Sequence, residues 1–287
     1  MERSAVSLDK ILEMLVEHRR VVISGLPGVG KSELASQVIE KAIEGTKTYK
    51  GIFWLSAASE AALDTGIYEM SRELNLLDGS TVGIKTARQM VLNELNKQDH
   101  WLMVVDNVDN VDLIQGFLPI RRGARHILMT TRYREAHSAI NGHSVILDEM
   151  TDGEASILFS KVFHNARNLP ETEFPVPEDT CAVTTLVKEL GCLPLAIIQA
   201  AAYLRACQDD VSNYIRIYRQ ARDTLWEWKP TQGKDYISVA TVMALSFQKF
   251  THRQKSIRLF GLISYFAPDN IPELLWTSNP RFQDHTL

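Results

Sequence analysis

The chain has 287 residues, of which 45% are hydrophobic and 23% charged, a mixture typical of a folded protein and not of a disordered one. Its 31 Lys and Arg against 35 Asp and Glu give a net charge of −4, unlike the basic balance of most nucleic-acid-binding proteins. The sequence shows no apolar run of the ~18 residues that a membrane span needs, no signal peptide, and no paired cysteine spacing. We therefore expect a soluble cytoplasmic protein without membrane or nucleic-acid partners.

Strand-like and helix-like segments alternate through the first half of the chain. Short runs of β-branched and large apolar residues predict buried parallel strands, and apolar residues three and four positions apart predict helices. Such alternation implies βαβ crossovers and therefore a three-layer α/β domain. The strands are expected at 21–23, 52–55, 101–105, 127–130 and 144–147, and the helices at 8–18, 32–43, 60–76 and 86–96.

Strand signals stop near residue 148, and the remainder is predicted to be helical. Thr151 and Glu154 have the spacing of a capping box, which marks the start of a helix. Proline-containing connectors are expected at 168–178 and 228–235. Further helices are expected at 179–190, 194–207, 211–226, 240–250 and 256–266. These changes of pattern predict an α/β domain at 1–150, an all-α helical domain at 151–235 and a third domain at 236–287.

A glycine-rich segment lies between the first predicted strand and the next helix. Its sequence, GLPGVGKS, fits the pattern G-x-x-x-x-G-K-[ST] of the phosphate-binding P-loop. Glycines let backbone amides approach phosphate oxygens closely, and the helix N-terminus attracts the same anion. Lys31 would neutralise the terminal phosphates, and Ser32 would bind Mg²⁺. The predicted cofactor-binding residues here are Gly25, Leu26, Pro27, Gly28, Val29, Gly30, Lys31, Ser32 and Glu33.

The third predicted strand ends in an acidic residue. The apolar run WLMVV leads into Asp106, which places a carboxylate beside the P-loop, where it can hold Mg²⁺. Lys31 and Asp106 are thus the candidate catalytic residues, and Ser32 and Asp106 the candidate metal ligands. Asn107 stands where hydrolytic relatives often carry a second acid, and a neutral amide cannot take a proton from water. Asp109 could replace that acid, although a solvated turn explains it equally well. We expect slow hydrolysis or none.

Arginines lie on both sides of the fourth predicted strand. Arg132 follows the fourth strand, a position from which a guanidinium can read a γ-phosphate through paired hydrogen bonds. Most arginines are simply solvated, so the position alone does not establish that role. Three arginines around Gly123 are interpreted as an exposed turn and not as a trans-acting finger: Arg121, Arg122 and Arg125.

The segment GCLPLA lies at a predicted junction between two helices. Gly191 can end the first helix in the left-handed conformation, and Pro194 suits the first turn of the second. Pro194 could also lay its ring against an adenine base. Periodicity does not choose between a tight helix–helix corner and a nucleotide contact.

In this order the motifs resemble those of the NB-ARC family, a group of STAND-class P-loop ATPases. The family includes apoptotic protease-activating factors, plant disease-resistance receptors and fungal NLR-like proteins. The resemblance rests on GLPGVGKS, WLMVVDN, ILMTTR and GCLPLA, and is supported by FWLSAAS, DGEASILFSKVF and LSFQKF. It implies a P-loop domain, a helical domain and a winged-helix domain that is partial, since the family's Met-His-Asp motif would lie beyond Leu287.

The resemblance also implies a function. Residues 25–32 would hold ADP or ATP with Mg²⁺, Arg132 would sense the γ-phosphate, and Pro194 would contact adenine. The family uses an ADP-bound closed form and an ATP-bound form that self-oligomerises, in innate immunity and programmed cell death. Two alternatives stay open: an AAA+-like ATPase or P-loop kinase with genuine turnover, and an interaction scaffold that does not use nucleotide. The intact P-loop argues against the scaffold.

Overall fold

The computed structural model describes residues 8–45, 49–77, 82–120, 122–164, 180–228 and 234–250. The chain divides into two units, Met1–Leu245 and Ser246–Leu287, and the first is described below. The connector predicted at 168–178 and the helix predicted at 256–266 lie outside the described residues. The domain boundaries expected near 150 and 235 stay predictions.

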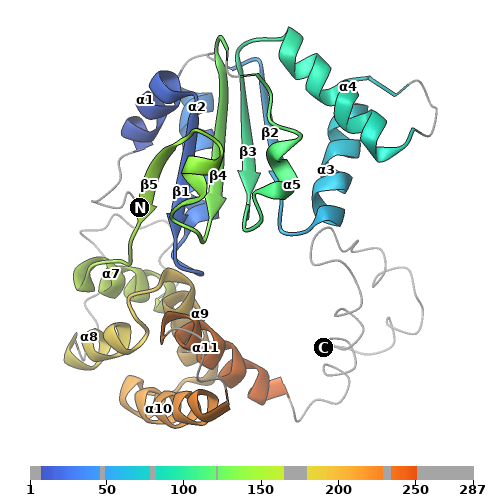
Figure 1. The fold of residues 1–287 in the computed structure, drawn as a ribbon. Coiled ribbons are helices and arrows are strands. Elements are labelled where there is room, and N and C mark those ends of the chain that lie inside the picture. The colour runs from blue at the N-terminus through green and yellow to red at the C-terminus, as the bar shows by residue number, and fades with distance from the viewer. Residues whose placement is uncertain are drawn as a thin grey trace, which may run out of the picture. The chain divides into compact units, whose positions relative to one another are not determined.

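Five parallel strands form a single sheet in the order β2-β3-β4-β1-β5, which confirms the expected α/β class. Strand β1 lies between β4 and β5, where Ser24 lies opposite Thr131 and Gly25 opposite Leu147. Because the strands are parallel, their carboxyl ends meet at one edge of the sheet, where the arrowheads lie in Figure 1. The strands are β1 Arg20–Gly25, β2 Gly51–Ser56, β3 Trp101–Asp106, β4 Arg125–Thr131 and β5 His143–Leu147.

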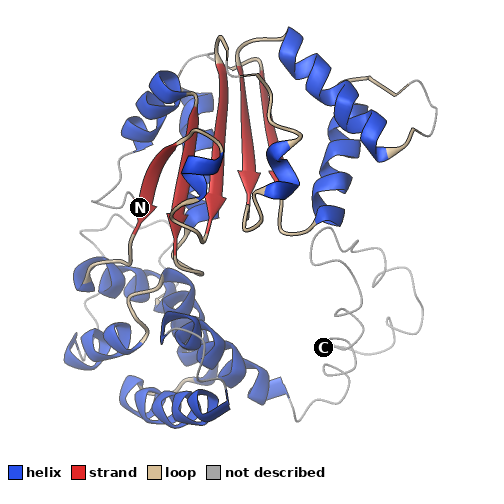
Figure 2. Ribbon diagram, in the orientation of Figure 1, coloured by secondary structure: helices blue, strands red, loops and turns tan. Residues whose placement is uncertain are grey.

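Helices cover both faces of the sheet (Figure 2). Alternate strand residues point to opposite faces, so Val21 and Ile23 join one apolar cluster while Val22 joins the other. The first cluster includes side chains of α1 Leu8–His18 and α2 Lys31–Glu44, and the second those of α3 Glu60–Glu73 and α4 Ile84–Lys97. Two short helices were not predicted, because four residues carry too little periodicity: α5 Asp112–Gln115 and α6 Ala136–Ala139.

A group of helices follows the sheet. The capping box is confirmed: Thr151 Oγ1 accepts from the Glu154 amide at 3.3 Å, and the Glu154 carboxylate accepts from the Thr151 amide at 2.9 Å. The helix expected from residue 240 begins at Lys234, so the connector predicted at 228–235 is too long. The helices are α7 Asp152–Phe163, α8 Thr180–Glu189, α9 Pro194–Cys207, α10 Val211–Trp228 and α11 Lys234–Phe250. Within the described ranges, none of them combines the length and apolar content of a membrane span.

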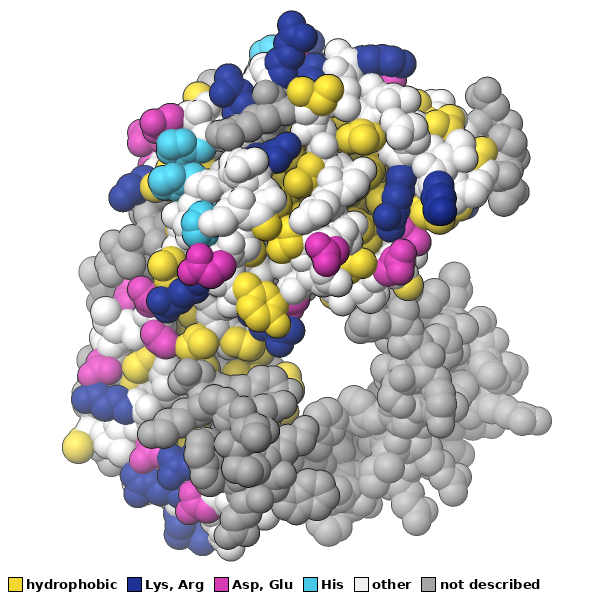
Figure 3. All heavy atoms as spheres, in the orientation of Figure 1, with side chains coloured by type: hydrophobic (Ala, Val, Ile, Leu, Met, Phe, Trp, Pro, Cys, Tyr) yellow, Lys and Arg dark blue, Asp and Glu magenta, His cyan; other side chains and the backbone are white. Residues whose placement is uncertain are grey.

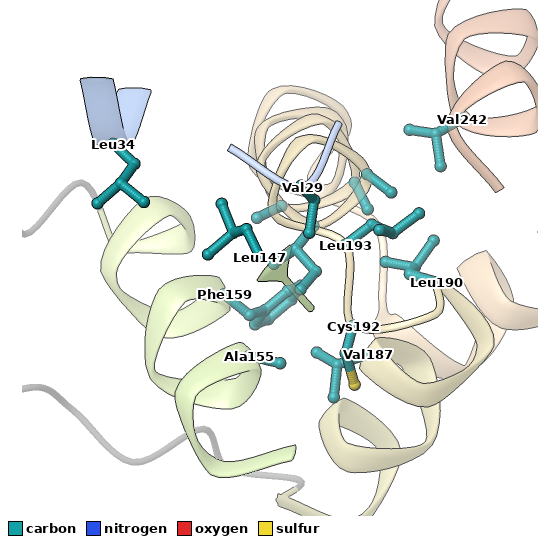
Figure 4. Packing of buried hydrophobic residues seen from close by; sticks show 14 of the residues in the cluster. Val29, Leu34, Leu147, Ala155, Phe159, Val187, Leu190, Cys192, Leu193 and Val242 are labelled. Carbon is teal, nitrogen blue, oxygen red and sulfur yellow. The ribbon is translucent and has the colours of Figure 1, made fainter. Parts of the chain in front are cut away.

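The apolar cluster on the α1 and α2 face continues into these helices. Figure 4 shows Val29 of the P-loop, Leu147 of β5 and Phe159 of α7 lying together, with Leu193 beside them. Val29, Phe159 and Leu193 are almost completely buried. The turn that follows β1 is therefore anchored in a core that the sheet and the helices share.

One arginine prediction is wrong. Arg125 does not lie in an exposed turn: it is the first residue of β4 and only 8% exposed. Its Nε donates to Asp99 Oδ1 at 2.7 Å and to the Gln98 carbonyl at 2.9 Å, which keeps the charge paired. Arg122 is exposed as expected, and Arg121 lies outside the described residues. Both signs of charge occur over the described surface in Figure 3.

A buried histidine generates a prediction about stability. His126 of β4 is 4% exposed, and its Nδ1 lies 2.6 Å from the Tyr49 hydroxyl oxygen. Burial, helped by the charges of Arg19 and His100, lowers the pKa of His126 to about 4. The unfolded chain binds a proton near pH 6.5, so the unfolded state gains protons first as the pH falls and folding stability decreases.

We expect His126 to account for a loss of about 2 kcal/mol in unfolding free energy between pH 7 and pH 5. His126→Phe should remove this part of the pH dependence, whatever its effect on absolute stability. Urea unfolding at the two pH values measures it, with exposed His164→Phe as the matched control. An unchanged pH dependence in His126→Phe would contradict the assignment.

Candidate functional site

The glycines of the P-loop occupy positions that other residues do not fit. Gly28 and Gly30 have φ angles of 79° and 97°, in the left-handed region that favours glycine. A Cβ on Gly25 would collide with the Leu147 carbonyl oxygen. A Cβ on Gly28 would lie 3.1 Å from Leu195 Cβ and 3.2 Å from Val239 Cγ2. The turn therefore depends on glycine both for its backbone angles and for its close contacts.

Backbone amides without acceptors gather at this turn and at the start of α2. Four amides donate to no acceptor within the described part of the chain: those of Gly28, Gly30, Lys31 and Ser32. The positive end of the helix dipole lies at the same place. An anion with several oxygens, such as a polyphosphate, fits this set of donors. Val29 can contribute only main-chain atoms, since its side chain is buried.

Lys31 lies at the centre of the site. Its side chain is 7% exposed, and Nζ donates to the carbonyl oxygens of Gly25 at 3.0 Å and Leu26 at 2.9 Å. Burial lowers the pKa of Lys31; Asp109 and Asp106 oppose this shift, while Arg132 adds to it. These three side chains therefore act electrostatically on the same ammonium group. In contrast, Glu33 is exposed and accepts from Gln37 on α2 at 2.9 Å.

Asp106 is held by hydroxyl donors from two other elements. Ser32 Oγ donates to Asp106 Oδ1 at 2.8 Å, and Thr130 Oγ1 donates to the same oxygen. Asn107 Nδ2 donates to Oδ2 at 3.3 Å. The described residues contain no cluster of three His, Cys, Asp or Glu side chains suited to a metal. A Mg²⁺ ion at Ser32 and Asp106 would therefore complete its shell with phosphate or water oxygens.

Arg132 lies just beyond β4 and pairs with Asp109. The Arg132 amide donates to Asp109 Oδ1 at 3.0 Å, and its Nε donates to Oδ2 at 2.7 Å. The Arg132 side chain is 49% exposed and that of Asp109 28%. Sequence patterns singled out each residue but not their pairing, because nothing in the spacing shows which loops of neighbouring strands touch.

Pro194 begins α9 directly after a tight corner. Gly191 and Cys192 have φ angles of 67° and 51°, and the Cys192 amide donates to Val187 O at 2.9 Å. The corner is thus confirmed, with the left-handed glycine that the pattern predicts. The next amide along, that of Leu195, donates to the Gly28 carbonyl at 3.2 Å. This bond brings the first turn of α9 against the P-loop; an adenine contact by Pro194 stays a prediction.

Comparison with known proteins identifies the family. The NB-ARC domain matches residues 4–168, more than half of the chain. The chain belongs to the NB-ARC family. NB-ARC domains are P-loop NTPases, a fold that implies nucleotide binding.

Relatives of this NB-ARC chain are much longer. A nucleotide-binding leucine-rich repeat (NLR)-like protein of Hyaloscypha variabilis is 26% identical over 71% of this chain and 21% of its own length. A probable disease resistance RPP8-like protein 2 of Arabidopsis thaliana is 24% identical over 93% of this chain and 30% of its own. The chain therefore spans less than a third of either relative.

Two solved structures that resemble this NB-ARC chain share less sequence identity with it than these relatives do. A Walker-type ATPase of Pyrococcus abyssi is 13% identical, with a TM-score of 0.48 over 77% of this chain and 72% of that one. A signal-transduction ATPase with numerous domains and a tetratricopeptide repeat sensor, from Pyrococcus horikoshii, is 18% identical, with a TM-score of 0.39 over 69% and 30%. The family assignment therefore stands on the domain match.

Gly28 provides a test of the site's geometry. We expect Gly28→Ala to destabilise the fold by about 1–2 kcal/mol, because alanine is strained at a φ of 79° and its Cβ would press on Leu195. Gly116→Ala is the matched control, since Gly116 has a φ of −77° and open space around it. Thermal unfolding of the two variants measures the difference. Equal melting temperatures would show that the turn does not require glycine at Gly28.

Proposed function

We propose that this chain binds ADP and ATP together with Mg²⁺, and that it forms the nucleotide-controlled switch of an NLR-like signalling protein. The observation that carries the proposal is the set of four acceptor-free amides beside the buried ammonium of Lys31. Donors in this arrangement suit a chain of phosphate groups better than a single carboxylate. The family assignment supports the same ligand class.

The proposal gives each residue a role. Residues 25–33 hold the phosphates through their main chain, and Lys31 leaves the carbonyl oxygens of Gly25 and Leu26 to neutralise the terminal phosphate. Ser32 and Asp106, already in contact, hold Mg²⁺, which when bound neutralises phosphate charge. Arg132 reads the γ-phosphate. Pro194, held next to the P-loop by the Leu195–Gly28 hydrogen bond, contacts adenine.

Slow hydrolysis follows from the side chains after β3. Asn107 donates its amide nitrogen to Asp106, and its neutral side chain cannot take a proton from water. Asp109, the other nearby acid, accepts from Arg132 through both of its carboxylate oxygens. Occupancy by ADP or ATP, rather than rapid turnover, is then the quantity that the site controls.

Contacts with the helices supply a means of switching. The P-loop carbonyl of Gly28 accepts from α9, and Val239 of α11 lies beside Gly28. Nucleotides shift such an arrangement only if ADP and ATP bind its two conformations with different affinities. We propose that residues 151–235 form the helical domain that responds, that residues 236–287 begin a winged-helix domain, and that the ATP state self-oligomerises in innate immunity or cell death.

The rival functions make different demands. An AAA+-like ATPase or P-loop kinase needs a free carboxylate near Asp106, and steady phosphate release that Asp106→Ala abolishes would favour it. A scaffold that does not use nucleotide has no need of a buried Lys31 beside acceptor-free amides, and an unchanged melting temperature at saturating ADP would favour it. A nucleic-acid role has only the winged-helix resemblance behind it.

Lys31→Ala tests the phosphate assignment. We expect ADP affinity to fall at least tenfold, on the order of one charged hydrogen bond to phosphate. Titration calorimetry measures the affinity, and circular dichroism checks that the variant folds. Lys97→Ala, which removes the same charge from a side chain that is 73% exposed, should bind ADP like the wild type. Equal, tight binding of ADP by Lys31→Ala would refute the assignment.

A further inference from the structure

Asp109 and Arg132 form a two-point contact at the edge of the site. The Arg132 amide and Nε donate to different oxygens of the same carboxylate, at 3.0 Å and 2.7 Å. The main-chain bond fixes where the carboxylate lies, and the side-chain bond fixes the direction of the guanidinium. Among the described residues, Asp109 is the one side chain that pairs with Arg132.

This pair belongs to the same site as the P-loop lysine. Among the charged side chains that shift the pKa of Lys31, Asp109 has the largest effect and raises it, while Arg132 lowers it. Topology explains the closeness: Asp109 follows β3, Arg132 follows β4, and these strands are neighbours with their carboxyl ends at one edge. A γ-phosphate bound near Lys31 at this edge of the sheet is therefore expected to lie close to both partners of the pair.

We propose that Asp109 is a specificity-determining residue that favours ADP over ATP by holding Arg132. The inference rests on the proposed nucleotide-binding function. A γ-phosphate has to compete with the Asp109 carboxylate for the guanidinium, and it brings further negative charge beside that carboxylate. A diphosphate requires neither change. Because half of the Arg132 side chain is exposed, the pair is weak enough for ATP to displace.

The opposite role is also chemically reasonable and makes the opposite prediction. If Asp109 instead positioned Arg132 to receive the γ-phosphate, removing the carboxylate would weaken ATP binding. The geometry favours the holding role, since the carboxylate occupies Nε, one of the donors that a bidentate contact with phosphate would use. The sign of the change in ATP affinity therefore decides between the two roles.

Asp109→Asn is the informative variant. The asparagine side chain keeps the shape of aspartate and an oxygen that can accept from the Arg132 amide, but it loses the charge. With Mg²⁺ and a non-hydrolysable ATP analogue, we expect the ratio of Kd for the analogue to Kd for ADP to fall about fivefold, the range of an exposed ion pair. The Kd for ADP should change less than about twofold. Asp112→Asn, an exposed carboxylate nearby, is the control and should leave the ratio unchanged.

A double-variant cycle shows whether Asp109 acts through Arg132. In an Arg132→Ala background, Asp109→Asn should no longer change the ratio; a change of the same size there would overturn the inference. An unchanged or raised ratio in the single variant would also overturn it. If melting shows that the asparagine variant does not fold, Asp109→Ser takes its place with the same expectations.

The outcome also separates this inference from the proposed function. A wild-type chain that binds neither nucleotide overturns both. A wild-type chain that binds both nucleotides, with a ratio that Asp109→Asn leaves unchanged, overturns the inference alone.

Discussion

The site depends on a turn that is held in place by contacts with the helices, the core and Lys31. The Gly28 carbonyl accepts from the first turn of α9, the Val29 side chain fills the shared core, and the carbonyl oxygens of Gly25 and Leu26 accept from Lys31. With these groups paired, the loop keeps its shape while the amides of Gly28, Gly30, Lys31 and Ser32 stay without acceptors among the described residues. Glycine makes this possible, since the required φ angles are positive.

Parallel topology then brings distant residues to that turn. The carboxyl ends of β1, β3 and β4 lie side by side, so Ser32, Asp106 and Thr130 form one hydrogen-bonded group, and Asp109 meets Arg132 next to it. Helices α9 and α11 contact the P-loop at Gly28 through Leu195 and Val239. The residues proposed to bind phosphate and Mg²⁺ therefore lie together and contact the helices through Gly28, an arrangement that the proposed nucleotide-controlled switch requires.

Sequence patterns predicted those features that depend on residues close together in the chain. Buried strands and amphipathic helices have strong periodic patterns, and the capping box at Thr151 marks a helix start within four residues of chain. Contacts between strands carry no such pattern: neither the order β2-β3-β4-β1-β5 nor the Asp109–Arg132 pair could be read from spacing. Arg125 was misassigned for a related reason, since its burial depends on Asp99, which lies before the neighbouring strand. The Leu195–Gly28 bond likewise depends on tertiary packing.

Amide hydrogen exchange with and without Mg²⁺ and ADP tests the central claim most directly. The amides of Gly28, Gly30, Lys31 and Ser32 have no acceptor among the described residues, so they should exchange quickly in the free chain and much more slowly when ADP binds. ADP binding that leaves the exchange of these four amides unchanged would contradict the account, because the phosphates would then be held elsewhere.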